Sequence, residues 1–244
     1  MNQPEWSPDQ ALLPFAHIEG HLVHVHNIRH CSYVTAQEYT VWHYDRTFGL
    51  DRLQSVDFIV EPFSRWGLAH TFLSFGFADL GYLAISIEVR KRVGEQFSPL
   101  KGLVRHFQIM YVIGDERDLL HLRANLRQDP VYLYPVKAPE EKIRELFLNM
   151  VARANQLYTR PEFYNTLTNN CTTNIVAHVN NLAARKIARS WGIIFPAFSD
   201  RLAYHLGLID NTLPFHETRR RHRINDRARQ FANDPEFSTR IRQV

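Results

Sequence analysis

The stretch AHTFLSFGFADLGYLAISIEVRK, residues 69–91, decides the expected architecture. It contains two apolar runs, 69–77 and 81–91, whose β-branched and aromatic residues are typical of strands. Comparable runs predict further strands at 21–34, 56–63, 103–114 and 131–136. Together these runs predict an antiparallel sheet in the first half of the chain.

Helical patterns dominate the second half. After Pro139 the apolar residues recur at helical spacing from Ile143 to Leu157, with acidic residues near the start of the segment. Another helix is expected to begin near Cys171, because the apolar residues that follow it form one face. Shorter helices are expected at 115–125, where an Asp is a good N-cap, and at 199–209.

These elements define the expected fold class as α+β, an antiparallel sheet packed against helices. No linker divides the chain, so we expect one catalytic domain over residues 1–244, with its core at about residues 10–210. The chain of 244 residues is 45% apolar and 22% charged, which excludes a disordered protein and a small disulfide scaffold.

Targeting segments are not evident in the sequence. No apolar run approaches the roughly 20 residues that cross a bilayer, and the first residues lack the pattern of a signal peptide. As written, the chain is expected to be soluble and untargeted.

Positive charge is concentrated in the C-terminal tail, residues 216–244, which holds eight Arg against four acidic residues. Such a segment can bind phosphate in nucleic acid or in anionic lipid headgroups. Because acidic residues interrupt it and no groove-reading motif accompanies it, a solvated helix face is favoured and no nucleic-acid partner is expected. A membrane-surface role stays open.

The two cysteines, Cys31 and Cys171, lie in different local sequences. They fit one long-range disulfide, two buried thiols, or one structural and one reactive thiol. Cys171 follows Asn169 and Asn170 and opens the helical pattern. Free backbone amides and the positive end of the helix dipole would stabilise a thiolate there. The Cys171 N–H, aided by a side chain of Asn169 or Asn170, would stabilise an oxyanion.

A thiol nucleophile needs a base, and His70 is the best-placed histidine because it opens the predicted strand 69–77. Ser86 and Glu88 share a face of the next strand and are candidates to orient the imidazole. The simpler alternatives are a half-buried strand histidine bonded to a carbonyl, and a Glu88 ion pair with Arg90 or Arg92.

No metal site or cofactor is expected. His24 and His26 would share a strand face within a histidine-rich segment, but no acidic residue or cysteine stands at a supporting ligand spacing. The stretch SWGIIFPAF, residues 190–198, could line an acyl groove, and ordinary packing is the preferred interpretation.

Several longer motifs carry a resemblance to a known family. They include PFAHIEGHLVHVHNIRHCSY near the start, AHTFLSFGF, YLAISIEVRK, LKGLVRHFQIMYVIGDERDLLHLR, DPVYLYPV and PEFYNTLTNNCTTNI. Over about residues 10–210 the chain resembles the Lnb-type lipoprotein N-acyltransferase family, in its periplasmic domain.

The resemblance implies a papain-like thiol fold in permuted order, similar to NlpC-type enzymes, with the His strand before the Cys helix. It makes His70 the general base and Cys171 the acyl-accepting nucleophile, and it leaves the third residue open. The implied donor is a phospholipid-like or diacylglyceryl ester, and the implied acceptor is the α-amine of a bacterial lipoprotein. The implied place is the periplasmic face of the inner membrane.

Two rival functions stay open at this point. A cysteine peptidase or amidase of the same fold would use the same residues, with a polar cleft and water as second acceptor. A non-catalytic binding domain would pair Cys171 with Cys31 or leave Cys171 inert to alkylation.

Overall fold

The computed structural model describes residues 5–64, 66–184, 186–188 and 190–243. Its strands are β1 (Phe15–Glu19), β2 (Leu22–Tyr33), β3 (Tyr39–Gly49), β4 (Leu53–Pro62), β5 (Ala69–Phe77), β6 (Gly81–Arg90), β7 (Gln108–Asp115), β8 (Tyr132–Pro135) and β9 (Glu162–Phe163). Its α-helices are α1 (Pro99–Leu103), α2 (Glu116–His121), α3 (Glu140–Thr159), α4 (Cys171–Leu182), α5 (Trp191–Ile194), α6 (Ser199–His205), α7 (Phe215–Arg221), α8 (Asn225–Gln230) and α9 (Phe237–Arg240). Short helical turns are η1 (Pro8–Gln10), η2 (Leu50–Arg52), η3 (Leu122–Leu126, a π-helix) and η4 (Pro196–Phe198).

The strands form one large sheet in the order β1-β2-β7-β6-β5-β4-β8, with β3 on β2 and β9 on β7. All pairings are antiparallel except a single β2–β7 bridge, Arg29 with Gly114. The predicted α+β class, an antiparallel sheet packed against helices, is therefore confirmed. Strand β5 has the predicted bounds, whereas β1, β3 and β9 are additional to the prediction.

One predicted strand begins later than expected. Residues 103–107 precede β7, which starts at Gln108. Ser98 caps α1 by accepting from the Lys101 N–H, and Arg105 takes a left-handed φ of 56° that a strand does not tolerate. The chain therefore turns here before it enters the sheet.

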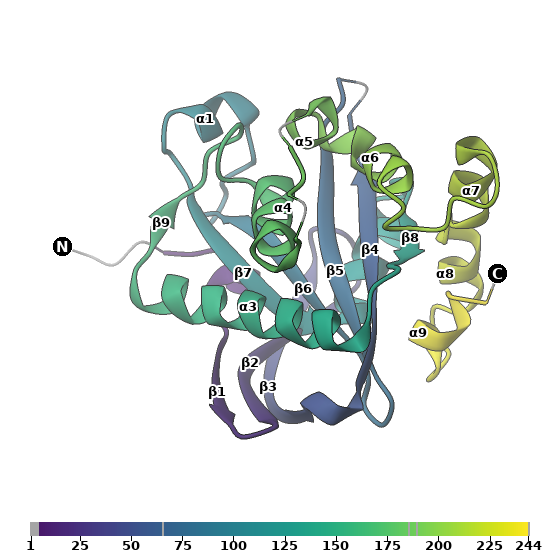
Figure 1. Cartoon of the computed structure of the whole chain (residues 1–244). Coiled ribbons are helices and arrows are strands. Elements are labelled where there is room, and N and C mark those ends of the chain that lie inside the picture. Colours follow the sequence, from purple (N-terminus) through teal and green to yellow (C-terminus); the bar gives the residue numbers. More distant parts are fainter. Residues whose placement is uncertain (1–4, 65, 185, 189, 244) are drawn as a thin grey trace.

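The two faces of the sheet carry separate apolar cores. On one face, Leu73 and Phe75 of β5 pack against Phe147 of α3 and Ile175 of α4. On the other, Phe72 of the same strand belongs to a cluster supplied by α2, η3 and the C-terminal helices. Figure 1 shows α3 and α4 in front of the sheet and α7 to α9 at its side. Successive residues of β5 thus enter different environments.

The basic C-terminal tail is folded onto the sheet, and most of its arginines have partners. Ile224, Ala228 and Phe237 are buried in the second core. Arg219 pairs with buried Asp200, and Arg242 pairs with Asp57 and Glu116. The expectation of a solvated helix face is wrong for these arginines, because their guanidinium groups neutralise buried carboxylates.

Among the described residues, no helix combines the length and the apolar character that crossing a bilayer requires.

Candidate active site

Cys171 is the first residue of α4, as the sequence predicts, and its side chain is buried. Asn170 is the N-cap: its Oδ1 accepts from the Thr173 N–H at 2.9 Å, and the Thr173 hydroxyl accepts from the Asn170 N–H at 2.8 Å. This reciprocal capping box satisfies two amides that a helix start otherwise leaves unpaired. It also fixes the direction in which α4 presents its first residue.

Two backbone donors remain at this helix start. Among the described residues, the N–H groups of Cys171 and Thr172 donate no hydrogen bond. Unpaired amides at the positive end of a helix can stabilise an oxyanion that forms beside the thiol. The arrangement therefore offers the donor that the sequence predicts for Cys171 and a second one from Thr172.

The two asparagine side chains proposed to assist are engaged elsewhere. The Asn170 Nδ2 donates to the Thr166 carbonyl at 2.7 Å, and the Asn169 Nδ2 donates to the Phe163 carbonyl at 2.9 Å. Asn169 Oδ1 also accepts from Asn174 Nδ2. These bonds shape the loop before α4, so a direct contribution of either side chain to the oxyanion stays a prediction.

The thiol lies against the beginning of β5. Cys171 Sγ is 3.9 Å from the carbonyl oxygen of Ala69 and 3.8 Å from the hydroxyl of Thr172. The Thr172 hydroxyl lies 3.0 Å from the hydroxyl of Thr71. Strand β5 and the start of α4 are therefore joined by a small polar contact directly beside the sulfur.

His70 lies between Ala69 and Thr71, and its side chain points to the other face of the sheet. Its ring stacks on Phe72, and its Nε2 lies 2.7 Å from the Ser86 hydroxyl. The structure brings His70, Ser86 and Glu88 together, as predicted, but shows no contact between the imidazole and the thiol among the described residues. Side chains alternate between the two faces of a strand, so Ala69 and Thr71 face α4 and His70 faces away from it and from the thiol.

Glu88 is held by Arg123, not by Arg90 or Arg92. Its Oε1 accepts from the Ser86 hydroxyl at 2.9 Å and from Arg123 Nη2 at 3.0 Å. Burial raises the pKa of Glu88, but the positive charges of Arg123 and Arg29 outweigh it and hold that pKa well below its usual value. Glu88 is therefore a charged carboxylate that orients Ser86, which in turn contacts the histidine.

Burial, reinforced by Arg123, lowers the pKa of His70 to about 3. Burial and Arg153 lower the pKa of His178, on α4, to about 4. Both imidazoles are neutral at pH 7 in the folded protein. A pKa near 3 also makes the imidazole of His70 a weak base in this environment.

These two lowered values predict acid sensitivity. The unfolded chain binds protons at histidine near pH 6.5, whereas folded His70 and His178 resist protonation until about pH 3 and 4. Each group should therefore reduce the free energy of unfolding by about 1.4 kcal/mol per pH unit as the pH falls below about 6.5. Urea unfolding of wild type, His70→Gln and His178→Gln between pH 7 and 4.5 measures these slopes.

In His70→Gln and in His178→Gln, the slope of the free energy of unfolding against pH should be smaller by about 1.4 kcal/mol per pH unit. His216→Gln, at an exposed position, should leave this slope unchanged. Identical slopes in all four proteins would contradict the neutral, buried state of the two histidines.

Cys31 and Cys171 are both free thiols. The predicted alternative of a disulfide between these two residues is therefore wrong, and a binding domain with an inert Cys171 stays open. Cys31 is buried on β2, where burial and Asp118 raise the pKa of its thiol to about 12. Cys31 is therefore a buried thiol that stays protonated at neutral pH.

We expect iodoacetamide at pH 7.5 to modify Cys171 at least about tenfold faster than Cys31, since thiolates are the reactive species. Peptide mapping over time measures the two rates in one sample. Cys31→Ser should keep the fast phase and Cys171→Ser should lose it, while both thiols should react in urea. Faster modification of Cys31 would contradict the assignment.

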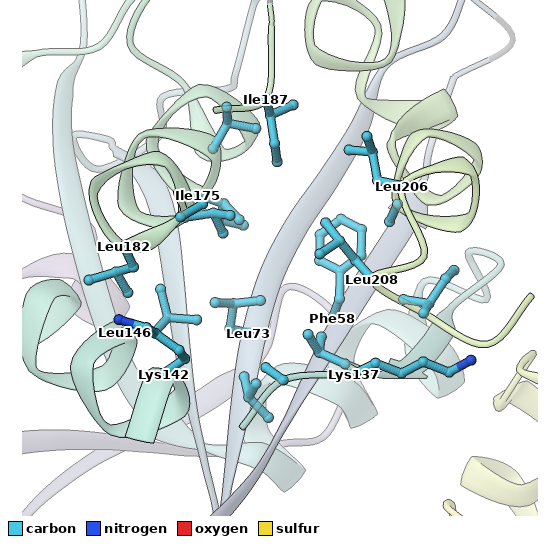
Figure 2. A pocket seen from close by; sticks show the side chains of 18 of the residues that line it. Phe58, Leu73, Lys137, Lys142, Leu146, Ile175, Leu182, Ile187, Leu206 and Leu208 are labelled. Atoms are coloured by element: carbon cyan, nitrogen blue, oxygen red, sulfur yellow. The ribbon is translucent and has the colours of Figure 1, made fainter. Parts of the chain in front are cut away.

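An apolar cavity of about 220 Å³ lies beside α4. Its walls come from one side of α4, from α3 and the segment before it, from α6 and the segment after it, and from the sheet face formed by β4 and β5 (Figure 2). Of the described residues that line it, only Lys137, Lys142, Thr172 and Ser199 have polar side chains. Thr172 follows Cys171 in the chain, so the cavity reaches the start of α4.

The two lysines contribute their aliphatic stems. Lys137 Nζ bonds Asp210 at 3.1 Å and Lys142 Nζ bonds Glu145 at 2.7 Å, so both charges are neutralised away from the apolar walls. Figure 2 shows Lys137 extending away from the cavity. The space between the walls therefore suits a hydrocarbon chain.

Residues 190–198 do not line this cavity. Gly192, Ile193 and Pro196 are buried, as ordinary packing requires, but Trp191 and Phe198 are exposed.

In the histidine-rich segment, the described side chains make local hydrogen bonds. His24 bonds Thr47, and His26 bonds Asp45. No group of three potential metal ligands lies together among the described residues.

Arg123 is not among the residues that the sequence predicts for the site, yet it is buried and bonds Glu61 at 2.7 Å as well as Glu88. An Arg inside the apolar stretch LLHLRANL is a signal that could have identified it. The apolar face of α4 was recognised as a helix face, and the structure shows that Ile175, Val176, Val179 and Leu182 also line the cavity.

The fold and the site define a mixed domain with a buried thiol at a helix start beside an apolar cavity. The family model of the Lnb N-terminal periplasmic domain matches residues 39–200, more than half of the chain. The chain therefore belongs to this family. Comparison with curated proteins and with solved structures gives no match in either set.

Proposed function

We infer that this protein is a thiol acyltransferase of the periplasm. Cys171 would take a fatty acyl chain from a phospholipid or diacylglyceryl ester and pass it to the N-terminal amine of a lipoprotein, at the periplasmic face of the inner membrane. The observation that carries this proposal is the apolar cavity lined by Thr172, the residue next to Cys171. Membership of a periplasmic domain family supports the compartment.

The proposed reaction has two steps. In the first, the thiol loses its proton to a base, sulfur attacks the ester carbonyl carbon, the ester C–O bond breaks, and the leaving alkoxide takes the proton. In the second, an amine attacks the thioester, the C–S bond breaks, and the thiolate regains a proton. The N–H groups of Cys171 and Thr172 are placed to donate to the carbonyl oxygen as charge develops on it.

His70 is the proposed base, and this role requires a movement. The ring lies on the opposite face of β5 from α4, so the start of the strand would have to rearrange to bring it from Ser86 to the sulfur, which lies 3.9 Å from the carbonyl of the preceding residue. Such a movement would also have to restore the basicity of the imidazole, because burial is the largest cause of its lowered pKa. We expect His70→Gln to slow acylation of Cys171 by about 100-fold or more, and His178→Gln, which changes another buried histidine, to leave it within about threefold.

A peptidase or amidase would need a polar cleft for a peptide backbone. The cavity beside Cys171 is almost entirely apolar, and the lysines at its edge are paired with acids. This lining favours an acyl chain over a peptide.

The experiment that tests the proposal supplies phospholipid vesicles and a synthetic lipopeptide with a free N-terminal amine. Wild type should convert the lipopeptide to its N-acyl form, and Cys171→Ser should not. Release of free fatty acid without N-acylation would identify a hydrolase and overturn the transferase assignment.

A further inference from the structure

A group of exposed apolar side chains lies at one end of the sheet. We define the aromatic rim as Phe63, Trp66, Trp191, Ile194 and Phe198, which are exposed by 40 to 86%. Two of the chain's four tryptophans belong to it. Exposed aromatic groups in one area commonly mark a surface that contacts protein or lipid.

The two segments of the rim are in contact. The Ala197 N–H donates to the Gly67 carbonyl at 3.1 Å. Gly67 also packs so closely on Phe195 that an added Cβ would lie 3.1 Å from its ring. Phe195 in turn stacks on Trp191, with 5.5 Å between the ring centres. The β4–β5 loop and the α5–η4 segment therefore form one surface.

This surface adjoins both the thiol and the cavity. The β4–β5 loop leads directly into Ala69, whose carbonyl is 3.9 Å from Cys171 Sγ. On the other side, Gly192 of α5 packs against Leu202, which lines the cavity. Figure 1 shows α5 at the end of β4 and β5, close to α4.

The sequence segments that contain the rim are rich in positive charge. Between Ala183 and Ser199 the sequence contains two Arg and one Lys and no acidic residue, and the loop 63–68 adds another Arg. Lys186 is exposed. Tryptophan together with cationic side chains is the composition that suits the interface of an anionic bilayer.

We propose that the aromatic rim docks on the surface of a bilayer that contains anionic phospholipid, so that an acyl chain can pass from the bilayer into the apolar cavity and reach Cys171. This inference rests on the proposed function for its purpose, and its test is separate. Docking would bury the rim tryptophans among headgroups and place the start of β5 next to the membrane.

Sedimentation with vesicles of phosphatidylglycerol and phosphatidylcholine measures the docking. Wild type should bind, and the Trp66→Ala/Trp191→Ala variant should bind at least about tenfold more weakly. Trp42→Ala, which removes a tryptophan that is 59% exposed on β3, should bind like wild type. A thermal melt verifies that each variant is folded.

A second variant keeps the docking testable if the alanine variant does not fold. Trp66→Phe/Trp191→Phe keeps the rim apolar but leaves only Trp6 and Trp42 to fluoresce. Lipids with brominated chains should quench the emission of wild type and not that of this variant. Equal binding by wild type and the alanine variant, or no binding by wild type, would overturn the docking.

Two further results separate the alternatives. A rim-dependent dimer on gel filtration, without vesicle binding, would assign the rim to a second copy of the chain and overturn the docking. Acylation of wild-type Cys171 by a water-soluble short-chain thioester, measured without vesicles, tests the proposed function alone. Its absence alongside rim-dependent vesicle binding would overturn the function and support the docking.

Discussion

Val179→Asp should abolish most acylation of Cys171 by long-chain donors while reducing acylation by a short-chain thioester far less. Val179 is half-buried on α4 and lines the apolar cavity about two turns after Cys171. A carboxylate there needs water, which an acyl chain would displace. Losing contact with three or four methylenes is worth about 2.7 kcal/mol, so the long-chain rate should fall about 100-fold.

The matched control is Ala177→Asp, which places the same charge on the exposed side of α4. It should leave both rates within about twofold of wild type. Rates of adduct formation with both donors, measured by intact-mass spectrometry, test the prediction. An equal loss for both donors, or no loss for either, would show that the cavity does not hold the chain.

Arg242→Ala should lower the free energy of unfolding by about 3–5 kcal/mol, because it leaves two buried carboxylates without their cation. The Arg242 guanidinium donates to Asp57 at 2.8 Å and to Glu116 at 2.9 Å, and it stacks on Tyr82. Burial raises the pKa of Asp57 despite the nearby Arg242. Without Arg242, keeping the buried Asp57 carboxylate charged costs still more free energy.

Urea unfolding at pH 7 measures this loss. Arg229→Ala removes an exposed ion pair with Asp226 and should cost less than about 0.5 kcal/mol. The penalty of Arg242→Ala should shrink at pH 5, since protonation neutralises a buried carboxylate. A penalty below about 1 kcal/mol at pH 7 would mean that the C-terminal segment does not stabilise the sheet.

Local patterns predicted the elements that surround the candidate site. The apolar run 69–77 coincides with β5, the periodic residues after Pro139 with α3, and the asparagines before Cys171 with the cap of α4. Each of these depends on neighbours in sequence, so a single chain is enough to recognise it. The same is true of the alternation that places Ser86 and Glu88 on one face.

Contacts between segments that lie far apart in the sequence could not be predicted from local patterns. Alternation separates His70 from Ala69 and Thr71, but it does not say which face α4 covers. The role of Arg123 depends on contacts with Glu61, 62 positions earlier, and with Glu88. The C-terminal helices look polar in sequence because their apolar residues are sparse, yet Phe237 and Ile241 are buried.

The central claim is that Cys171 carries a fatty acyl thioester. Intact-mass spectrometry after incubation with phospholipid vesicles tests it most directly, with wild type, Cys171→Ser and Cys31→Ser compared. Wild type and Cys31→Ser should gain the mass of one acyl chain, which hydroxylamine should remove, and Cys171→Ser should gain none. An adduct that persists in Cys171→Ser, or no adduct on wild type while Cys171 alkylates rapidly, would contradict the claim.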